Sequence, residues 1–289
     1  MARCVAVMVG WSLFAVASGC AGGATQDGTA AALNVAPTDL TTGPGGSLFV
    51  SSASAGKVLR QVDGMWRDVP GPWARPYGLT AASDGRVCLA HFTSEDPLTR
   101  QSAVSCRDAG AWTREATGLG SGVNGLLATA EGIWAVGWQD TDIEQRDGRL
   151  SLIADGRITR RIDIPAYVPR FAVETPTGDL LVSAWREDAS GFTGGAILRV
   201  TREGSVDMFS DALTRPAGLA YGHDGVWVAD TAAGALVLLS HDGRESARQK
   251  GLEEPTGVTL VEADRLCLAE TAAHRITCLV PANVLGGSP

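Results

Sequence analysis

Short apolar segments, separated by glycine, proline and aspartate, follow one another through most of the chain. Leu48-Phe49-Val50 follows the turn Pro44-Gly45-Gly46, and Val226-Trp227-Val228 follows His223-Asp224-Gly225. Segments of this length that are rich in aliphatic and aromatic residues and bounded by turn residues are typical of β-strands. Helical periodicity is nearly absent, so the pattern predicts an all-β fold.

One opening motif recurs six times: a proline, any residue, usually glycine, then an aliphatic residue. A turn and a second strand follow each motif. Successive motifs are 39, 47, 46, 47 and 39 residues apart, and the third has valine in place of proline. A period of this length is typical of one four-stranded propeller blade. The six motifs are Pro37-Thr38-Asp39-Leu40, Pro76-Tyr77-Gly78-Leu79, Val123-Asn124-Gly125-Leu126, Pro169-Arg170-Phe171-Ala172, Pro216-Ala217-Gly218-Leu219 and Pro255-Thr256-Gly257-Val258.

The repeats predict a six-bladed β-propeller over residues 31–281, followed by a tail over residues 282–289. The sixth repeat ends before a fourth strand, and residues 30–35 can supply that strand from the other end of the chain. Such closure removes the exposed sheet edges of an open array. A linear solenoid is the alternative, but it requires capping repeats, which the sequence does not contain.

Four cysteines occupy equivalent positions in the second and sixth repeats. Cys88 and Cys267 fall in second strands, and Cys106 and Cys278 fall in third strands. Pairing Thr271 with His274 in the last hairpin places Cys267 opposite Cys278, within reach of a disulfide. We therefore predict disulfides Cys88–Cys106 and Cys267–Cys278, with four buried free thiols as the alternative. The spacing matches no zinc motif.

The N-terminus predicts export. One charged residue, Arg3, precedes an apolar stretch from Val5 to Ala17, which is too short to span a bilayer and is typical of a secretory signal over residues 1–19. Ala17-Ser18-Gly19-Cys20 resembles a bacterial lipobox, which implies lipidation of Cys20 and a flexible tether over residues 20–30. The expected location is a membrane facing the periplasm or the cell surface. The alternative is cleavage after Ala17, which would release a soluble exported protein.

Charge and motifs exclude several functions. The formal net charge is −8, whereas binding to nucleic acid requires a basic surface. The sequence contains no Gly-x-Ser-x-Gly elbow, phosphate loop or dinucleotide fingerprint. We expect a monomer that contacts the membrane only through its lipid anchor.

The innermost strand of a propeller blade begins, and the second strand ends, at the same face, so two rings of side chains are expected around the funnel there. Converging polar groups in such a cleft are the default binding-site hypothesis. The first ring comprises Thr38, Tyr77, Asn124, Arg170, Ala217 and Thr256. The second ring comprises Ser52, His91, Gly137, Ala184, Asp230 and Glu270.

Three residues of the second ring, His91, Asp230 and Glu270, are the candidate catalytic residues. A histidine titrates near neutrality, although one without a fixed partner is often structural. Aspartate at position 230 is also a common turn former. Glu270 is expected opposite Arg275, where it can form a cross-strand ion pair instead of acting as a base.

Tyr77, Asn124 and Arg170 of the first ring are candidate ligand-binding residues. The amide oxygen of Asn124 can ligate a cation, or the amide can hold a backbone group. Arg170 can bind an anionic ligand, or it can neutralise the carboxylates of Asp230 and Glu270.

Aromatic residues occupy the next position outward on three consecutive blades, at Phe92, Trp138 and Trp185. The same blades have the longest hairpin loops, roughly residues 92–102, 138–148 and 185–195. We therefore predict a lopsided binding surface, since aromatic side chains are favoured anchors. The alternative is that the long loops pack onto their own scaffold.

Two segments carry a family resemblance: Pro216-Ala217-Gly218-Leu219 through Val228-Ala229-Asp230-Thr231, and Leu268-Ala269-Glu270 through His274-Arg275-Ile276. They resemble the regucalcin/gluconolactonase-like six-bladed propellers, which have relatives among NHL-repeat proteins and streptogramin lyases. The resemblance covers roughly residues 36–280. It implies the propeller fold and a divalent cation, calcium or zinc, at the funnel mouth.

The cation ligands of that family are a first-blade glutamate, asparagines and the aspartate of a Pro-Asp-Gly motif, and only Asn124 matches them. Thr38-Asp39, Arg170 and Pro216-Ala217-Gly218 stand at the other positions. Hard cations prefer several oxygen ligands, so the cation is expected to bind weakly. The lyases of the family place a histidine after an opening proline, where this chain has Thr256, and a glutamate that Glu270 matches.

Two functions follow as hypotheses. The first is a non-catalytic propeller that binds a small molecule or a protein partner on its funnel face. The alternative is a metal-dependent lactonase, hydrolase or lyase of the gluconolactonase-like superfamily, with a diverged site that uses His91, Asp230 and Glu270. The missing cation ligands favour the first hypothesis.

Overall fold

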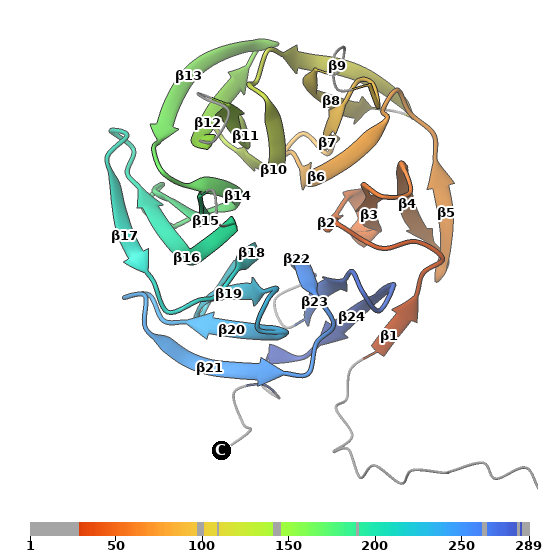
Figure 1. Ribbon diagram of the computed structural model, residues 1–289. Coiled ribbons are helices and arrows are strands. Elements are labelled where there is room, and N and C mark those ends of the chain that lie inside the picture. The colour runs from red at the N-terminus through yellow and green to blue at the C-terminus, as the bar shows by residue number, and fades with distance from the viewer. Residues whose placement is uncertain are drawn as a thin grey trace, which may run out of the picture.

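The computed structural model describes residues 29–96, 101–108, 110–140, 146–188, 191–261, 265–281 and 284. Six four-stranded antiparallel sheets surround a central axis as the blades of a propeller (Figure 1). The predicted all-β, six-bladed fold is therefore confirmed. In the described part of the chain, no helix is long and apolar enough to cross a membrane. The predicted signal, the lipidation site Cys20 and residues 21–28 lie outside the described residues.

Blades 1 to 5 run outward from the axis in chain order. Blade 1 comprises β2 (Asp39–Thr42), β3 (Leu48–Ser52), β4 (Lys57–Val62) and β5 (Met65–Val69), with a 3₁₀ turn at Pro44–Gly46. Blade 2 comprises β6 (Arg75–Ala81), β7 (Val87–Phe92), β8 (Ser102–Asp108) and β9 (Ala111–Thr117). Blade 3 comprises β10 (Gly122–Thr129), β11 (Gly132–Asp140), β12 (Arg146–Ala154) and β13 (Arg157–Ile164).

The second half of the chain repeats this arrangement. Blade 4 comprises β14 (Val168–Glu174), β15 (Leu180–Asp188), β16 (Gly191–Val200) and β17 (Val206–Ser210). Blade 5 comprises β18 (Pro216–Gly222), β19 (Gly225–Asp230), β20 (Ala235–Leu239) and β21 (Glu245–Lys250). Blade 6 comprises β22 (Pro255–Val261), β23 (Arg265–Glu270), β24 (Arg275–Leu279) and, from the other end of the chain, β1 (Thr29–Ala32).

The ring closes through β1, as predicted. This strand pairs antiparallel with β24 from Thr29 opposite Cys278 to Ala32 opposite Arg275. The residues that follow β1 then enter the core between blades 6 and 1, where Leu33 and Val35 are buried. The first and last strands of the propeller therefore belong to the same blade.

The cores lie between neighbouring blades, and each second strand contributes to two of them. In β19, Val226 and Val228 pack toward blade 4, whereas Trp227 and Ala229 pack toward blade 6. Successive side chains of a strand point to opposite faces, and both faces are covered here. This explains why the second strands are continuous apolar segments and lack the alternation of a half-exposed strand.

The glycine of the opening motif is required by the close approach of neighbouring inner strands. A Cβ at Gly78 would lie 2.5 Å from the Cα of Gly125, and one at Gly218 would lie 2.3 Å from the carbonyl oxygen of Thr256. Only a residue without a side chain fits such a contact. Blades 1 and 4 differ, because they carry Asp39 and Phe171 at this position.

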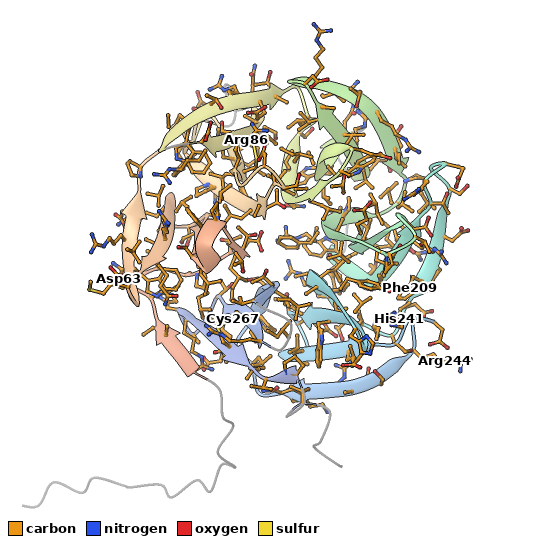
Figure 2. The ribbon with its side chains drawn as sticks, turned by 180° about the vertical axis from the view of Figure 1, so that it is seen from behind. Asp63, Arg86, Phe209, His241, Arg244 and Cys267 are labelled. Atoms are coloured by element: carbon orange, nitrogen blue, oxygen red, sulfur yellow. A yellow bond between two sulfur atoms is a disulfide. The ribbon has the colours of Figure 1, made fainter. Side chains whose placement is uncertain are left out.

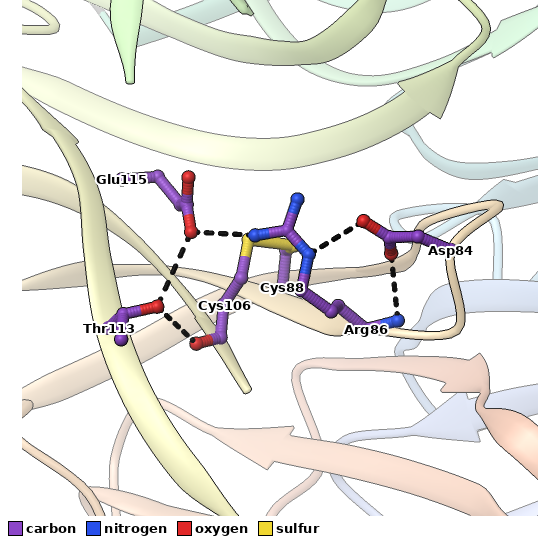
Figure 3. A network of polar contacts seen from close by, with 6 residues as sticks. All are labelled: Asp84, Arg86, Cys88, Cys106, Thr113 and Glu115. Carbon is purple, nitrogen blue, oxygen red and sulfur yellow. Dashed lines mark hydrogen bonds and ion pairs between the residues drawn. A yellow bond between two sulfur atoms is a disulfide. The ribbon is translucent and has the colours of Figure 1, made fainter. Parts of the chain in front are cut away.

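Both predicted disulfides are present. Cys88 lies opposite Cys106 and Cys267 lies opposite Cys278, each pair with a Cα–Cα distance of 4.0 Å. Figure 3 shows the first disulfide together with Arg86, which donates to Asp84 and Glu115 at 2.7 Å each. Each bridge joins the second and third strands of one blade.

Loss of the Cys267–Cys278 bridge should weaken the blade that contains the first and last strands of the propeller. A disulfide that closes a loop of this order contributes about 3 kcal/mol. We therefore expect the Cys267→Ala/Cys278→Ala protein to have a free energy of unfolding lower by about this amount, measured by urea titration. Thiol titration under denaturing, non-reducing conditions is the check on the pairing. Four titratable thiols in the domain would contradict it.

Candidate functional site

The two predicted rings lie side by side at the funnel face, which we define as the face where the inner strands begin and the second strands end. In blades 2 to 6, the first residue of the opening motif pairs with a residue of the second ring, so the first-ring residue of each of these blades follows directly after such a pair. The pairs are Pro76 with His91, Val123 with Gly137, Pro169 with Ala184, Pro216 with Asp230 and Pro255 with Glu270.

His91 is buried between blades 1 and 2, on the same side of β7 as Leu89. Its Nε2 lies 2.9 Å from Ser105 Oγ and its Nδ1 lies 3.1 Å from the carbonyl oxygen of Phe92. Burial lowers the pKa of the His91 imidazole, and the charge of Arg114 acts in the same direction. Both ring nitrogens therefore have partners within the scaffold.

Asp230 holds the backbone that leads into blade 5. Its side chain is fully buried, and its two oxygens accept the backbone N–H groups of Thr214 at 2.9 Å and Arg215 at 2.8 Å. The guanidinium of Arg248 lies 3.7 Å away. The carboxylate thereby fixes the position of the chain at Arg215.

Glu270 performs the equivalent task in blade 6. It accepts two hydrogen bonds from Arg275, each of 2.8 Å, one from Thr277 and one from the backbone N–H of Glu253 at 2.9 Å. Burial opposes ionisation, but these donors keep the pKa of Glu270 below its usual value. The cross-strand pair with Arg275, one of the two interpretations of this residue, is present.

Asn124 and Arg170 form one unit. The Asn124 amide donates to the carbonyl oxygen of Pro169 at 2.8 Å, and its Oδ1 accepts from Arg170 at 2.9 Å. Thr231 and Thr271 donate to the carbonyl oxygens of Pro255 and Pro37 in the same way, each at 2.7 Å. Three of the opening motifs are thus held by a polar side chain of the preceding blade.

Two of the predicted aromatic residues pack against the inner strands. Phe92 is buried, with its ring centroid 5.6 Å from that of Tyr77 in an edge-to-face arrangement. Trp138 is half-buried over Gly122, where an added Cβ would lie 2.1 Å from the indole. These contacts connect the second strands of blades 2 and 3 to the inner strands of the same blades.

Trp185 is buried beneath two arginines. The guanidinium carbons of Arg170 and Arg215 lie 4.6 Å and 4.8 Å from the centroid of its ring. The ring of Phe192 meets Trp185 edge to face at 6.3 Å. Arg215 and Phe192 were missed by the sequence reasoning, because neither belongs to a repeated position.

Asp39 is the other residue that the sequence reasoning missed. Its carboxylate is buried between the inner strands of blades 6 and 2, where Oδ2 accepts the N–H of Leu79 at 2.7 Å and Oδ1 would lie 2.6 Å from a Cβ on Gly257. Burial raises the pKa of Asp39 to about 7, although the N–H groups and the charge of Arg170 oppose this shift. The sequence feature that could have identified Asp39 is a carboxylate at the motif position where four other repeats have glycine.

The residues at the funnel mouth do not fit the divalent cation that the resemblance implies. Asn124 Oδ1 already accepts from a guanidinium, which would repel a cation, and Glu270 and Asp230 are engaged by their own donors. Calcium requires six to eight oxygen ligands. Among the residues that the structure describes, no three His, Cys, Asp or Glu side chains form a metal-binding group.

A separate hollow lies away from the funnel, between blades 4 and 5. It has a volume of about 250 Å³ and is lined by Phe209, Tyr221 and His241, among others. Figure 2 shows Phe209 and His241 near the periphery of these blades. The hydroxyl of Tyr221 and Nδ1 of His241 are joined by a hydrogen bond of 2.9 Å, so these two polar groups of the hollow already have each other as partners.

Comparison with solved structures places this geometry among known propellers. A gluconolactonase from Xanthomonas campestris superimposes with a TM-score of 0.68 at 15% identity, covering 86% of each chain. A calcium-binding regucalcin from Agrobacterium tumefaciens gives 0.63 at 16%, covering 86% of this chain and 90% of its own. The chain has the fold of the gluconolactonase and regucalcin-like propellers.

Virginiamycin B lyase from Staphylococcus aureus has the same architecture, with a TM-score of 0.61 at 17% identity, covering 89% of this chain and 99% of the lyase. No protein-family model matches the sequence. No curated protein matches it either. Similarity at these identities establishes the fold, and the predicted resemblance is confirmed at that level.

Asp39 should make stability depend on pH. Since its pKa is raised from 3.8 to about 7, folding favours the protonated carboxyl, and stability is lost as the pH rises between these values. A shift of this size corresponds to about 4 kcal/mol. We expect Asp39→Asn to match the wild-type Tm near pH 4 and to exceed it at pH 8, measured by calorimetry. The exposed Asp207→Asn is the control, and an Asp39→Asn effect that is the same at every pH would contradict the assignment.

Proposed function

We propose that this protein is an exported, lipid-anchored propeller that binds a small molecule or a protein partner on its funnel face. The observation that carries the proposal is the group formed by Asp39, Asn124 and Arg170 at the inner strands. A buried carboxyl and a guanidinium held in place by an amide are polar groups of the kind that orient a ligand in a cleft. They come from blades 1, 3 and 4, where Asn124 accepts a hydrogen bond from Arg170 and the charge of Arg170 acts on the Asp39 carboxyl.

Binding is favoured over catalysis by what the polar side chains already do. His91, Asp230 and Glu270 each have scaffold partners for their reactive atoms. A general base must reach a substrate proton within hydrogen-bond distance. A binding site requires only that the donors, acceptors and aromatic surfaces keep their positions, which these contacts provide.

The position of β1 supports the proposed anchor. This strand is the outermost strand of blade 6, so the chain leaves the propeller at its rim and not at the funnel face (Figure 1). Residues 21–28 between a lipidated Cys20 and β1 can extend at most about 30 Å. The rim would then stay close to the membrane while the funnel face remains accessible.

The second candidate is a hydrolase or lyase with a diverged site, and Asp39 is the specific observation in its favour. A carboxyl whose pKa is about 7 is suited to proton transfer at neutral pH. Perturbed titration of a buried group is a common property of functional sites. In this hypothesis Asp39 takes the role of acid or base, and Arg170 binds an anionic part of the substrate.

Thermal unfolding of the full-length protein in detergent tests the binding proposal. The screen uses a small-molecule library and calcium, magnesium, manganese and zinc. A ligand at 100 times its Kd adds about 2.7 kcal/mol, so Tm should rise by several degrees. We expect Arg170→Gln to abolish the rise and Arg157→Gln, which changes an exposed arginine on the outer strand β13, to retain it. A rise that persists in Arg170→Gln would place the ligand elsewhere.

A lactone and ester screen tests the second candidate. If the protein is such an enzyme, the pH–rate profile should change slope near pH 7 and Asp39→Asn should lower turnover by at least about 100-fold. His91→Ala tests the catalytic set predicted from the sequence in the same assay. Full activity of Asp39→Asn would remove this residue from the mechanism.

A further inference from the structure

The two arginines above Trp185 are held by different means. Arg170 is fixed by its hydrogen bond to Asn124. Arg215 is fixed at two points. Its backbone N–H donates to Asp230 Oδ1 at 2.8 Å, and its guanidinium carbon lies 4.8 Å from the centroid of the Trp185 ring. The buried carboxylate of Asp230 thus determines where the Arg215 side chain begins, and the indole of Trp185 determines where it ends.

Arg215 is exposed, no carboxylate in the described part of the chain pairs with it, and its side chain donates to none of the described residues. A guanidinium that stacks on an aromatic ring keeps its N–H groups in its own plane, where they can bind a carboxylate or phosphate in a bidentate manner. The geometry is therefore preorganised for an oxyanion.

An apolar surface lies beside these donors. The ring centroid of Phe192 is 6.0 Å from the guanidinium carbon of Arg215. Phe192 is 38% exposed, and only three other large apolar side chains are as exposed within the described residues. The whole chain has a net charge of −8, so attraction of an anion depends on this local arrangement.

We propose that Arg215 and Phe192 form a binding site for a flat organic oxyanion, a ring that carries a carboxylate or a phosphate group. Arg215 pairs with the oxyanion and Phe192 packs against the ring. Trp185 and Asp230 are positioning residues, since they act through Arg215. This site gives the ligand class for binding on the funnel face and therefore rests on the function proposed above.

The test uses four probes on the full-length protein: benzoate, phenyl phosphate, inorganic phosphate and benzyl alcohol. Affinity is measured by tryptophan fluorescence and checked by calorimetry. We expect benzoate or phenyl phosphate to bind at least tenfold more tightly than benzyl alcohol and inorganic phosphate. Whichever of benzoate and phenyl phosphate binds more tightly shows whether the site prefers a carboxylate or a phosphate.

The variants locate the site. Arg215→Ala should weaken binding of the ring oxyanion at least tenfold, and Arg215→Lys should recover only part of it, because lysine lacks the planar fork. The matched control is Arg160→Ala. Arg160 is a half-buried arginine on the outer strand β13, and it also stacks on a tryptophan, Trp134 of β11. Trp185→Phe should weaken binding severalfold and leave the preference for oxyanions unchanged.

Any of three results with these probes would overturn the proposal. They are equal affinity for benzoate and benzyl alcohol, unchanged affinity in Arg215→Ala, and no binding of any probe at millimolar concentration. A library ligand whose binding depends on Arg170 but shows no preference for oxyanions would also overturn it, while leaving the function proposed for the funnel face intact. If no ligand is found whose binding depends on Arg170 or Arg215, both this proposal and the function proposed for the funnel face are wrong.

Discussion

The close approach of the six inner strands around the axis is the constraint on which the rest of the structure depends. At the glycine of the opening motif, neighbouring strands come so near that an added Cβ would lie 2.3 to 2.6 Å from an atom of the next blade. Each of these contacts joins two neighbouring blades, so together they link the blades into a ring, and the last blade is complete only when β1 pairs with β24. The candidate site at the axis is therefore a property of the closed ring and not of any blade.

Most polar side chains at the funnel face serve this closure. Thr231, Thr271 and Asn124 each hold the carbonyl oxygen of a proline in the next blade. Asp230 and Glu270 hold backbone N–H groups of the segments that lead into blades 5 and 6. A buried polar group without a partner costs free energy, so these residues are explained by the backbone groups that they satisfy.

The remaining polar groups are distributed unevenly around the ring. Blade 4 contributes Arg170, Trp185 and Phe192, blade 1 contributes Asp39, and Arg215 lies at the start of blade 5. Blade 4 departs from the glycine rule with Phe171 and blade 1 departs from it with Asp39. The two blades that break the repeat thus provide most of the chemistry, which agrees with the expectation that local exceptions in a consistent fold mark functional or strained sites.

The repeat, the closure by the N-terminal strand and both disulfides were determined by the sequence itself, because they depend on period and on register. A strand pairs residue by residue, so aligning Thr271 with His274 was enough to place Cys267 opposite Cys278. The members of both rings followed from the same counting. What a side chain contacts inside the ring depends on the neighbouring blade, which a linear period does not specify. Only the tertiary structure could therefore show that His91 lies between blades, that Asp230 holds Arg215, and that burial by three blades shifts the titration of Asp39.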